Sequence, residues 1–244
     1  MIPARKNRLL DAFFYLYLRR KLAQRFHGVH LRGGEHLAAL PADQAVIAFA
    51  NHTNWWDLLM LFRLTRVIPK SCYGMMEEKN LRKYEFFRAI GGFSVDLESR
   101  LGAALSLRYA ARLLRDPGNL VWIFPQGRLA TPYEPIEVRP GLPFLARIAP
   151  KALLLPVAFR YEFFRDDLPL ALIDVGAPFP AAGTDNVAIA AACQAQADRL
   201  AEAARTRDMS GFTSLLPRRL PINKKWEWVV RAATGRLAGF EPGN

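Results

Sequence analysis

Two side chains capable of acid–base chemistry stand close together in the segment FANHTNWWD, residues 49–57: His52 and Asp57. A histidine that is hydrogen-bonded to a carboxylate is held in one tautomer, and it can remove a proton from a hydroxyl group. Because no serine or cysteine nucleophile motif accompanies the pair, we expect this hydroxyl group to belong to a bound substrate. The spacing alone is a weak signal, since a histidine satisfied by a helix-capping network would explain it equally well.

The two side chains can meet only if the chain changes its conformation between them. On an unbroken helix, a separation of five residues corresponds to a rotation of about 140° around the axis, which would point the side chains apart. The apolar run 45–50 predicts a strand buried on both faces, and a helix is expected over 56–66. A strand–helix junction at Asn51 would place His52 in a loop and Asp57 in the first helical turn, where the two can converge.

The remaining pattern predicts the elements that would hold this junction. Strands are expected at 28–32, 45–50, 71–76, 93–96, 120–124, 152–160 and 171–175, and helices at 7–26, 56–66, 78–90, 99–115, 141–149 and 185–206. Strands that alternate with helices predict an α/β fold with a mostly parallel central sheet flanked by helices. We expect three regions: an N-terminal amphipathic, membrane-associating helix in 1–27, the main domain in 28–208, and a basic, aromatic tail in 209–244.

The composition is that of a globular protein with a large positive charge, because 34 Lys and Arg residues stand against 22 Asp and Glu residues. The net charge of +12 favours anionic partners, either nucleic acid or an acidic lipid surface, although a basic soluble protein would show it too. No apolar run approaches the roughly 20 residues that a membrane-spanning helix needs, so we expect a chain that does not cross a bilayer. The two cysteines, Cys72 and Cys193, show no spacing typical of a disulfide framework or a metal site.

Two segments combine aromatic and basic residues in a way that suits a membrane interface. In 7–26, apolar residues recur at three- and four-residue spacings among arginines and a lysine. Such a helix can lie in the headgroup plane, or it can cover the core of its own domain. In the tail, Trp226 and Trp228 stand among lysines and arginines, a pattern that fits an interface, single-stranded nucleic acid or a short helix packed on the domain.

Three further segments follow the His52 motif, and together the four blocks resemble those of the glycerolipid acyltransferases, whose best-known members are the 1-acylglycerol-3-phosphate acyltransferases. The first family block, Asn-His-x4-Asp, is matched by Asn51, His52 and Asp57. The second resembles GGFSVDLESR at 91–100, the third resembles FPQGRLA at 124–130, and the fourth is the proline of LPVA at 155–158. The resemblance covers about residues 28 to 180, with the blocks in the order of the family, so 28–208 would be an acyltransferase domain.

The resemblance implies an O-acyltransferase of phospholipid biosynthesis. Such an enzyme moves a fatty acyl group from acyl-CoA or acyl carrier protein to the hydroxyl group of a lysophospholipid-type acceptor, in the first place 1-acylglycerol-3-phosphate (lysophosphatidic acid). His52 would be the catalytic base, and Asp57 would orient it. The positions implied in substrate binding are Asn51, Arg100, Phe124, Pro125, Gln126, Gly127, Arg128 and Pro156. The resemblance implies no metal and no cofactor beyond the acyl thioester, and a peripheral location on the anionic cytoplasmic face of the cell membrane.

The chain departs from the family where the phosphate of the acceptor would bind. Leu97 stands where the second block of the family has an arginine, and in the third block Gln126 replaces a glutamate and Leu129 an arginine. Because an arginine fork holds phosphate bidentately, its displacement matters. Either the phosphate site is rebuilt from nearby arginines, or the acceptor is a phosphate-free lipid alcohol or glycolipid. The arginines available for a rebuilt site are Arg100, Arg128 and Arg139.

Three other interpretations fit parts of the sequence. The charge and the tryptophans also suit a nucleic-acid-binding protein, but the cations are scattered and no recognition motif is evident, so we expect no nucleic-acid partner. A family member that binds lipid without catalysis would fit the altered third block. A zinc site built from His27, His30 and His36 has neither a nearby cysteine nor a familiar ligand spacing, so we expect no metal.

Overall fold

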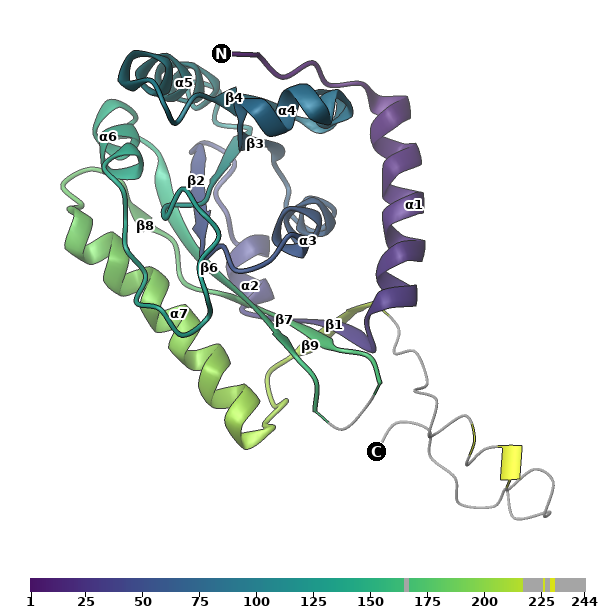
Figure 1. The fold of residues 1–244 in the computed structure, drawn as a ribbon. Helices are drawn as coiled ribbons and strands as arrows, with labels where there is room; N and C mark the ends of the chain where they lie inside the picture. The colour runs from purple at the N-terminus through teal and green to yellow at the C-terminus, as the bar shows by residue number, and fades with distance from the viewer. Residues whose placement is uncertain (165–166, 217–225, 227–228, 231–244) are drawn as a thin grey trace.

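A nine-stranded sheet forms the centre of the computed structural model, which describes residues 1–164, 167–216, 226 and 229–230 (Figure 1). The strands follow the order β4-β3-β5-β2-β6-β7-β1-β9, and β8 pairs with β6. Their bounds are β1 Gly28–Arg32, β2 Val46–Ala50, β3 Ser71–Glu77, β4 Gly92–Val95, β5 Asn119–Ile123, β6 Leu153–Glu162, β7 Leu170–Val175, β8 Phe179–Pro180 and β9 Thr213–Leu216. All neighbouring pairs from β4 to β6 are parallel, as is β1 with β7, so the predicted mostly parallel sheet is confirmed.

Within the described chain, three strand pairs are antiparallel, and the sequence did not predict them: β6 with β7, β6 with β8, and β1 with β9. The connection from β6 to β7 spans only residues 163–169, which is too short for a crossover that would return the chain in parallel. The last strand, β9, lies in the region that the sequence assigned to the tail, and it extends the sheet beyond β1. Trp228 and the cations around it lie outside the described residues.

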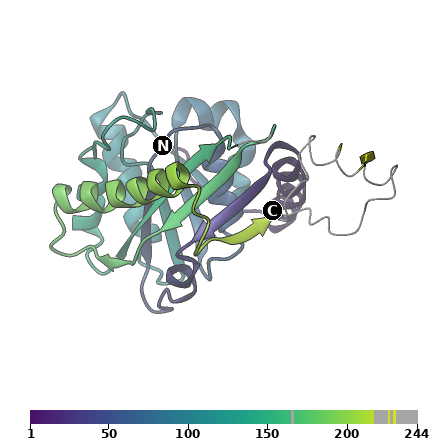
Figure 2. The same cartoon turned by 90° about the horizontal axis from the view of Figure 1, so that it is seen from below.

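Helices cover both faces of the sheet. Their bounds are α1 Arg8–Arg25, α2 Gly34–Ala38, α3 Trp56–Leu64, α4 Glu78–Lys83, the 3-10 helix η1 Glu85–Ile90, α5 Arg100–Leu113, α6 Gly141–Ile148 and α7 Asn186–Thr206. On one face, Leu22 of α1 and Met60 of α3 enter a first core cluster, while Leu107 of α5 and Leu142 of α6 enter a second cluster on the other face. Figure 2 shows α7 lying across this second face. The predicted α/β fold with helices on both sides of the sheet is therefore confirmed.

The single helix that the sequence predicts over 78–90 is wrong, because the chain breaks at Tyr84 into α4 and η1. On an unbroken helix, Leu81 and Phe87 would point about 120° apart around the axis. Tyr84 has backbone angles of φ −123° and ψ 60°, which are not helical, and the break lets both Leu81 and Phe87 be buried. Phe86 and Phe87 then join an aromatic cluster with Phe14 of α1. Tertiary packing has overridden the local helical pattern.

The first seven residues run along β4 and η1 as an extended strap. The N–H of Ser94 donates to the carbonyl of Ile2 at 2.9 Å, and the N–H of Ile2 donates to the Ser94 hydroxyl at 2.6 Å. The amino group of Met1 lies 3.2 Å from the Glu78 carboxylate. Hydrogen bonds from Arg82, Ser94 and this amino group lower the pKa of Glu78 to about 2. The strap therefore covers part of the backbone of the edge strand β4.

Candidate active site

The junction between β2 and α3 brings His52 and Asp57 together. β2 ends at Ala50 and α3 begins at Trp56, so His52 lies in the connecting loop and Asp57 in the first helical turn. The Nδ1 atom of His52 is 2.9 Å from Oδ2 of Asp57. The Asp57 side chain is 0% exposed, whereas the His52 side chain is 22% exposed. A buried carboxylate thus holds an imidazole whose other ring nitrogen is left for a substrate.

The carboxylate of Asp57 is held by several further donors. Its Oδ2 atom accepts the backbone N–H groups of Thr53 at 2.7 Å and Asn54 at 2.9 Å. Its Oδ1 atom accepts a hydrogen bond from the hydroxyl group of Tyr161, near the C-terminal end of strand β6, at 2.7 Å. Each of these bonds fixes the position of the carboxylate, and a charged acceptor makes them stronger than bonds between neutral groups.

Tyr161 is the residue of this site that the sequence analysis missed. Burial first, and then the negative charge of Asp57, raise the pKa of Tyr161 well above its ordinary value. The phenol therefore stays protonated and remains a hydrogen-bond donor. The only signal in the sequence is a tyrosine near the end of an apolar strand, because a buried tyrosine hydroxyl normally has a partner. Nothing in the sequence points to Asp57 as that partner, since 104 residues separate the two.

The third sequence block forms hydrogen bonds and a ring-stacking contact with the loop that carries His52. The backbone N–H of His52 donates to the side-chain oxygen of Gln126 at 3.1 Å, and its carbonyl accepts the N–H of Ala130 at 2.8 Å. The imidazole ring stacks on Phe124, with ring centroids 3.9 Å apart and an angle of 12° between the planes. Phe124 and Gln126 thus position the histidine, and Pro125 between them is buried.

Two of the predicted substrate-binding residues, Asn51 and Pro156, make contacts with the strands of the sheet. The side-chain amide of Asn51 pairs with the backbone of Phe159: its Nδ2 donates to the carbonyl at 3.0 Å, and its Oδ1 accepts the N–H at 2.8 Å. Pro156 lies within β6 opposite Phe49, and its carbonyl accepts the N–H of Gly176. Asn51 therefore fastens the end of β2 to β6, and Pro156 lies inside the sheet.

Gly127 allows a tight turn after β5. Its φ of 60° lies in the left-handed region, and a Cβ atom there would lie 3.0 Å from Cδ of Arg139, so glycine serves both the turn and the close approach. The N–H of Gly127 donates to the carbonyl of Phe124 at 3.1 Å. The N–H of Gly127 is therefore already paired within the turn.

The three arginines proposed for a rebuilt phosphate site have separate surroundings. Arg128 is exposed and pairs with Glu134 at 2.6 Å, whereas Arg139 packs over Gly127. Hydrogen bonds from the Thr131 backbone and from Arg128 lower the pKa of Glu134 to about 2. Arg100 is exposed at the start of α5, and no ion pair links it to another described residue. The structure places Arg139 against the third block, whereas Arg128 of that block is held by Glu134.

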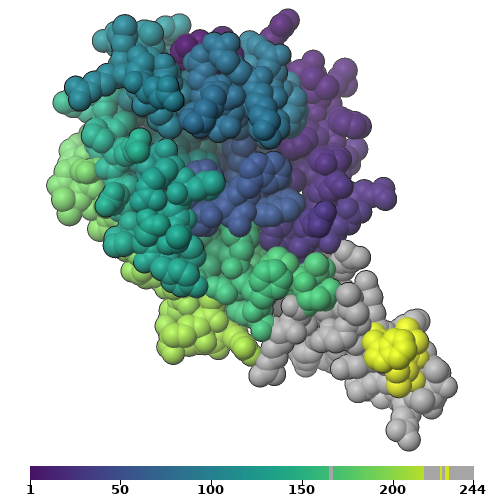
Figure 3. All heavy atoms as spheres, in the orientation of Figure 1, coloured from purple at the N-terminus to yellow at the C-terminus, as the bar shows by residue number. Residues whose placement is uncertain are grey.

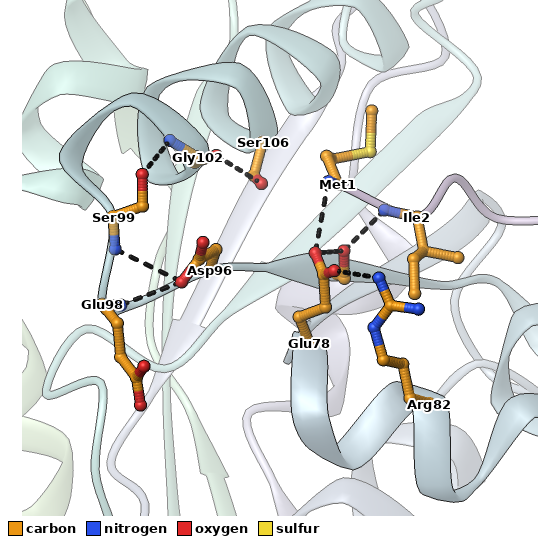
Figure 4. Close-up of polar contacts among 10 residues, drawn as sticks. Met1, Ile2, Glu78, Arg82, Asp96, Glu98, Ser99, Gly102 and Ser106 are labelled. Carbon is orange, nitrogen blue, oxygen red and sulfur yellow. Dashed lines mark hydrogen bonds and ion pairs between the residues drawn. The ribbon is translucent and has the colours of Figure 1, made fainter.

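The second sequence block sets the beginning of α5. The Asp96 carboxylate accepts the N–H groups of Glu98 and Ser99, at 3.0 Å and 3.3 Å, and the Ser99 hydroxyl accepts the N–H of Gly102 at 3.0 Å (Figure 4). These bonds satisfy donors that a helix start leaves free. Asp96 and Ser99 therefore determine where Arg100 emerges.

An apolar groove of about 670 Å³ opens beside the Asp57 carboxylate. It lies between α1, α3, the segment around η1 and the end of β6. Asn54 and Tyr161, which both donate to Asp57, belong to its lining. Most of the other lining side chains are aromatic or aliphatic, and Lys21 and Arg25 of α1 add positive charge. The groove has the character needed to hold an apolar chain next to the candidate catalytic pair.

A family model described as acyltransferase matches residues 29–160, which is more than half of the chain. This chain belongs to the acyltransferase family. Among solved structures, the fold of this acyltransferase is similar to that of the 1-acyl-sn-glycerophosphate (LPA) acyltransferase, PlsC, from Thermotoga maritima, with a TM-score of 0.57 and 16% sequence identity over 81% of this chain and 79% of that chain. At this identity, the likeness concerns the fold. A comparison with curated proteins gives no significant match.

The described part of this acyltransferase has no group of three or more His, Cys, Asp or Glu side chains arranged to hold a metal ion. His27 and His30 are buried; His27 lies directly before β1 and His30 lies within it, while His36 lies on α2. Among the helices that the structure describes, none combines the length and the apolar character needed to cross a membrane.

Proposed function

We propose that this acyltransferase moves a fatty acyl group from a thioester, acyl-CoA or acyl carrier protein, to the hydroxyl group of a lysophospholipid-type acceptor, in the first place 1-acylglycerol-3-phosphate. The observation that carries the proposal is the hydrogen bond from the His52 imidazole to a fully buried Asp57 carboxylate. The family and the fold supply the reaction class, and the four sequence blocks favour a glycerolipid substrate.

In the proposed mechanism, His52 acts as a general base. Its Nδ1–H is held by Asp57, so the second ring nitrogen removes the proton of the acceptor hydroxyl group as that oxygen attacks the thioester carbonyl. The tetrahedral intermediate then collapses, the carbon–sulfur bond breaks, and the thiolate takes the proton back from the imidazolium. Asp57 stabilises the imidazolium while it exists. The stacking on Phe124 keeps the ring in one orientation throughout the cycle.

The surface of α1 supports a peripheral position on an anionic membrane. Leu18 and Leu22 are buried against the domain, so this helix covers the core, as one of the two interpretations of its sequence required. Its other side exposes Leu9, Phe13 and Leu16, which are 83%, 70% and 63% exposed. Figure 3 shows α1 along one edge of the molecule, with side chains projecting outward. A helix that is apolar on both sides can pack on the domain and rest in the headgroup plane at once.

The proposed reaction is tested with purified protein, radiolabelled palmitoyl-CoA and a panel of acceptors. We expect transfer to 1-acylglycerol-3-phosphate, and a loss of roughly 100-fold or more in kcat for His52→Ala, because a positioned general base contributes about 10²–10⁴-fold. His36→Ala, on α2 and away from the site, is the matched control and should retain activity. A folded His52→Ala protein with near-normal transfer would contradict the mechanism.

A phosphate-free acceptor is the second candidate, and the pairing of Arg128 with Glu134 favours it, because that arginine is already neutralised. The same panel decides between the two when it includes a monoacylglycerol and a glycolipid. Faster transfer to these acceptors than to 1-acylglycerol-3-phosphate would favour the phosphate-free class. Transfer that requires the phosphate would point to Arg139 as the remaining arginine beside the third block.

A further inference from the structure

A second concavity, of about 750 Å³, lies at the N-terminal ends of β2 and β6, whereas His52 follows the C-terminal end of β2. Its lining comes from residues 43–45 and 149–152, which directly precede β2 and β6, and from the C-terminal halves of α5 and α6. A five-residue strand rises about 16 Å, so this α5–α6 groove is separate from the candidate active site.

Four exposed cations line the α5–α6 groove: Arg108, Arg112, Arg115 and Lys151. Asp43 is the only carboxylate residue among the lining residues. None of the four cations takes part in an ion pair with another described residue, in contrast to two exposed arginines on other helices: Arg82 pairs with Glu78, and Arg205 with Glu202. The helix α5, which carries two of these arginines, contains no acidic residue.

The spacing of these arginines is unfavourable when the groove is empty, because their positive charges repel one another. Side chains four positions apart share one side of a helix, so Arg108 and Arg112 of α5 repel each other, and Arg115 follows in the turn after the helix. Cations at the end of a helix usually complement its dipole, which accounts for Arg112 and Arg115. That explanation does not extend to Arg108, in the middle of α5, or to Lys151, which follows α6. An anion between them would remove the repulsion at all four positions.

We propose that the α5–α6 groove binds a soluble small molecule that carries several phosphate groups. Guanidinium groups donate two parallel hydrogen bonds to phosphate, and clustered cations favour a multivalent anion over a single charge. Leu114, Phe144 and Ile148 supply an apolar part of the lining against which the organic part of such a molecule can pack.

The position of the groove favours a soluble ligand over a lipid headgroup. α1, which exposes Leu9, Phe13 and Leu16, packs with α3 in the core cluster on one face of the sheet. α5 and α6 pack in the cluster on the other face. A molecule that rests on a membrane through α1 therefore turns the groove toward the aqueous side.

The test is calorimetric titration of the full-length protein with inorganic tripolyphosphate at about 0.15 M salt, where exposed charges are strongly screened. We expect saturable 1:1 binding, and an affinity at least tenfold weaker for the double variant Arg108→Gln/Arg112→Gln. The matched control, Arg82→Gln/Arg205→Gln, removes the same charge outside the groove and should stay within twofold of the wild type. All four positions are exposed, so both variants should unfold at the temperature of the wild type.

Three outcomes would overturn the proposal. Equal losses in the two double variants, or no saturable binding to the wild type, would mean that the cations attract anions only through the net charge. The third outcome comes from flotation with vesicles of phosphatidylglycerol. A tenfold loss of vesicle binding in Arg108→Gln/Arg112→Gln, with none in the control, would assign the groove to a lipid headgroup. None of these measurements depends on acyl transfer, so the groove is tested independently of the proposed reaction.

Discussion

At the level of single residues, the Asp57 carboxylate accepts hydrogen bonds from three groups in addition to His52. One carboxylate oxygen accepts the imidazole and two backbone N–H groups, and the other accepts the Tyr161 hydroxyl. A carboxylate buried without donors would be strongly destabilising, so these bonds permit a full negative charge at a position with no exposed surface. The charge is then available to orient and stabilise the imidazole.

We predict that Tyr161→Phe lowers kcat about tenfold and leaves KM nearly unchanged. The change removes only the hydroxyl group that donates to Oδ1 of Asp57, and one such bond contributes about 1.4 kcal/mol, or a factor of ten in rate. Steady-state kinetics with palmitoyl-CoA measure both constants. Tyr109→Phe is the control, because that hydroxyl contacts Ala4 and lies away from the carboxylate. Equal effects of both changes would argue against a positioning role for Tyr161.

The same variant should change the stability of the protein at alkaline pH. Because folding raises the pKa of Tyr161, the unfolded chain ionises this phenol first. Its contribution to stability is therefore complete below the ordinary tyrosine pKa of about 10 and is lost as the pH rises further. Urea unfolding at about pH 8 and pH 10.5 should show a smaller fall in the free energy of unfolding for Tyr161→Phe than for the wild type.

At the level of elements, the strand–helix junction that the sequence predicts at Asn51 is what the structure shows. The apolar run and the required break were visible because both are local. The split of the predicted helix at Tyr84, the antiparallel return of β7 and the pairing of β9 could not be predicted, because each depends on partners far away in the chain. For the same reason, the sequence did not indicate the bond from Tyr161 to Asp57. The motif also did not predict that Asn51 links β2 to β6.

We predict that Asn51→Ala destabilises the protein by about 2–4 kcal/mol, because it leaves both the N–H and the carbonyl of Phe159 buried without their partners. Urea unfolding followed by circular dichroism measures the change. Asn119→Ala is a graded control, since the buried Asn119 side chain makes one bond, to the Leu113 carbonyl, and should cost less. A loss below about 1 kcal/mol for Asn51→Ala would contradict the stabilising role of the link to Phe159 and would favour a role of Asn51 in substrate binding.

At the level of the whole molecule, the two faces of the sheet have different surroundings. One face carries α1, with Leu9, Phe13 and Leu16 exposed, and the groove lined by Asn54 and Tyr161, which donate to Asp57. The other carries α5, α6 and α7. A lipid substrate would therefore approach from the α1 side, with Lys21 and Arg25 near the phosphates of the bilayer.

We predict that Leu9→Ser/Phe13→Ser/Leu16→Ser lowers the partition coefficient onto anionic vesicles at least tenfold. These three side chains are exposed in the free protein, so their loss removes apolar area that the membrane would bury and leaves the core intact. Vesicle flotation measures the partition coefficient. Val187→Ser, at a 75% exposed position on α7, is the control and should bind like the wild type. Unchanged flotation of the triple variant would exclude α1 as the contact.

The separation of 104 positions between Asp57 and Tyr161 has a consequence for how the site is assembled. The imidazole and the carboxylate are neighbours in the chain and can meet as soon as the β2–α3 junction forms, since contacts between near neighbours close only a short loop. The phenol arrives with β6, after most of the domain has been synthesised. The hydrogen bonds around the Asp57 carboxylate are therefore complete only once β6 has joined the sheet beside β2.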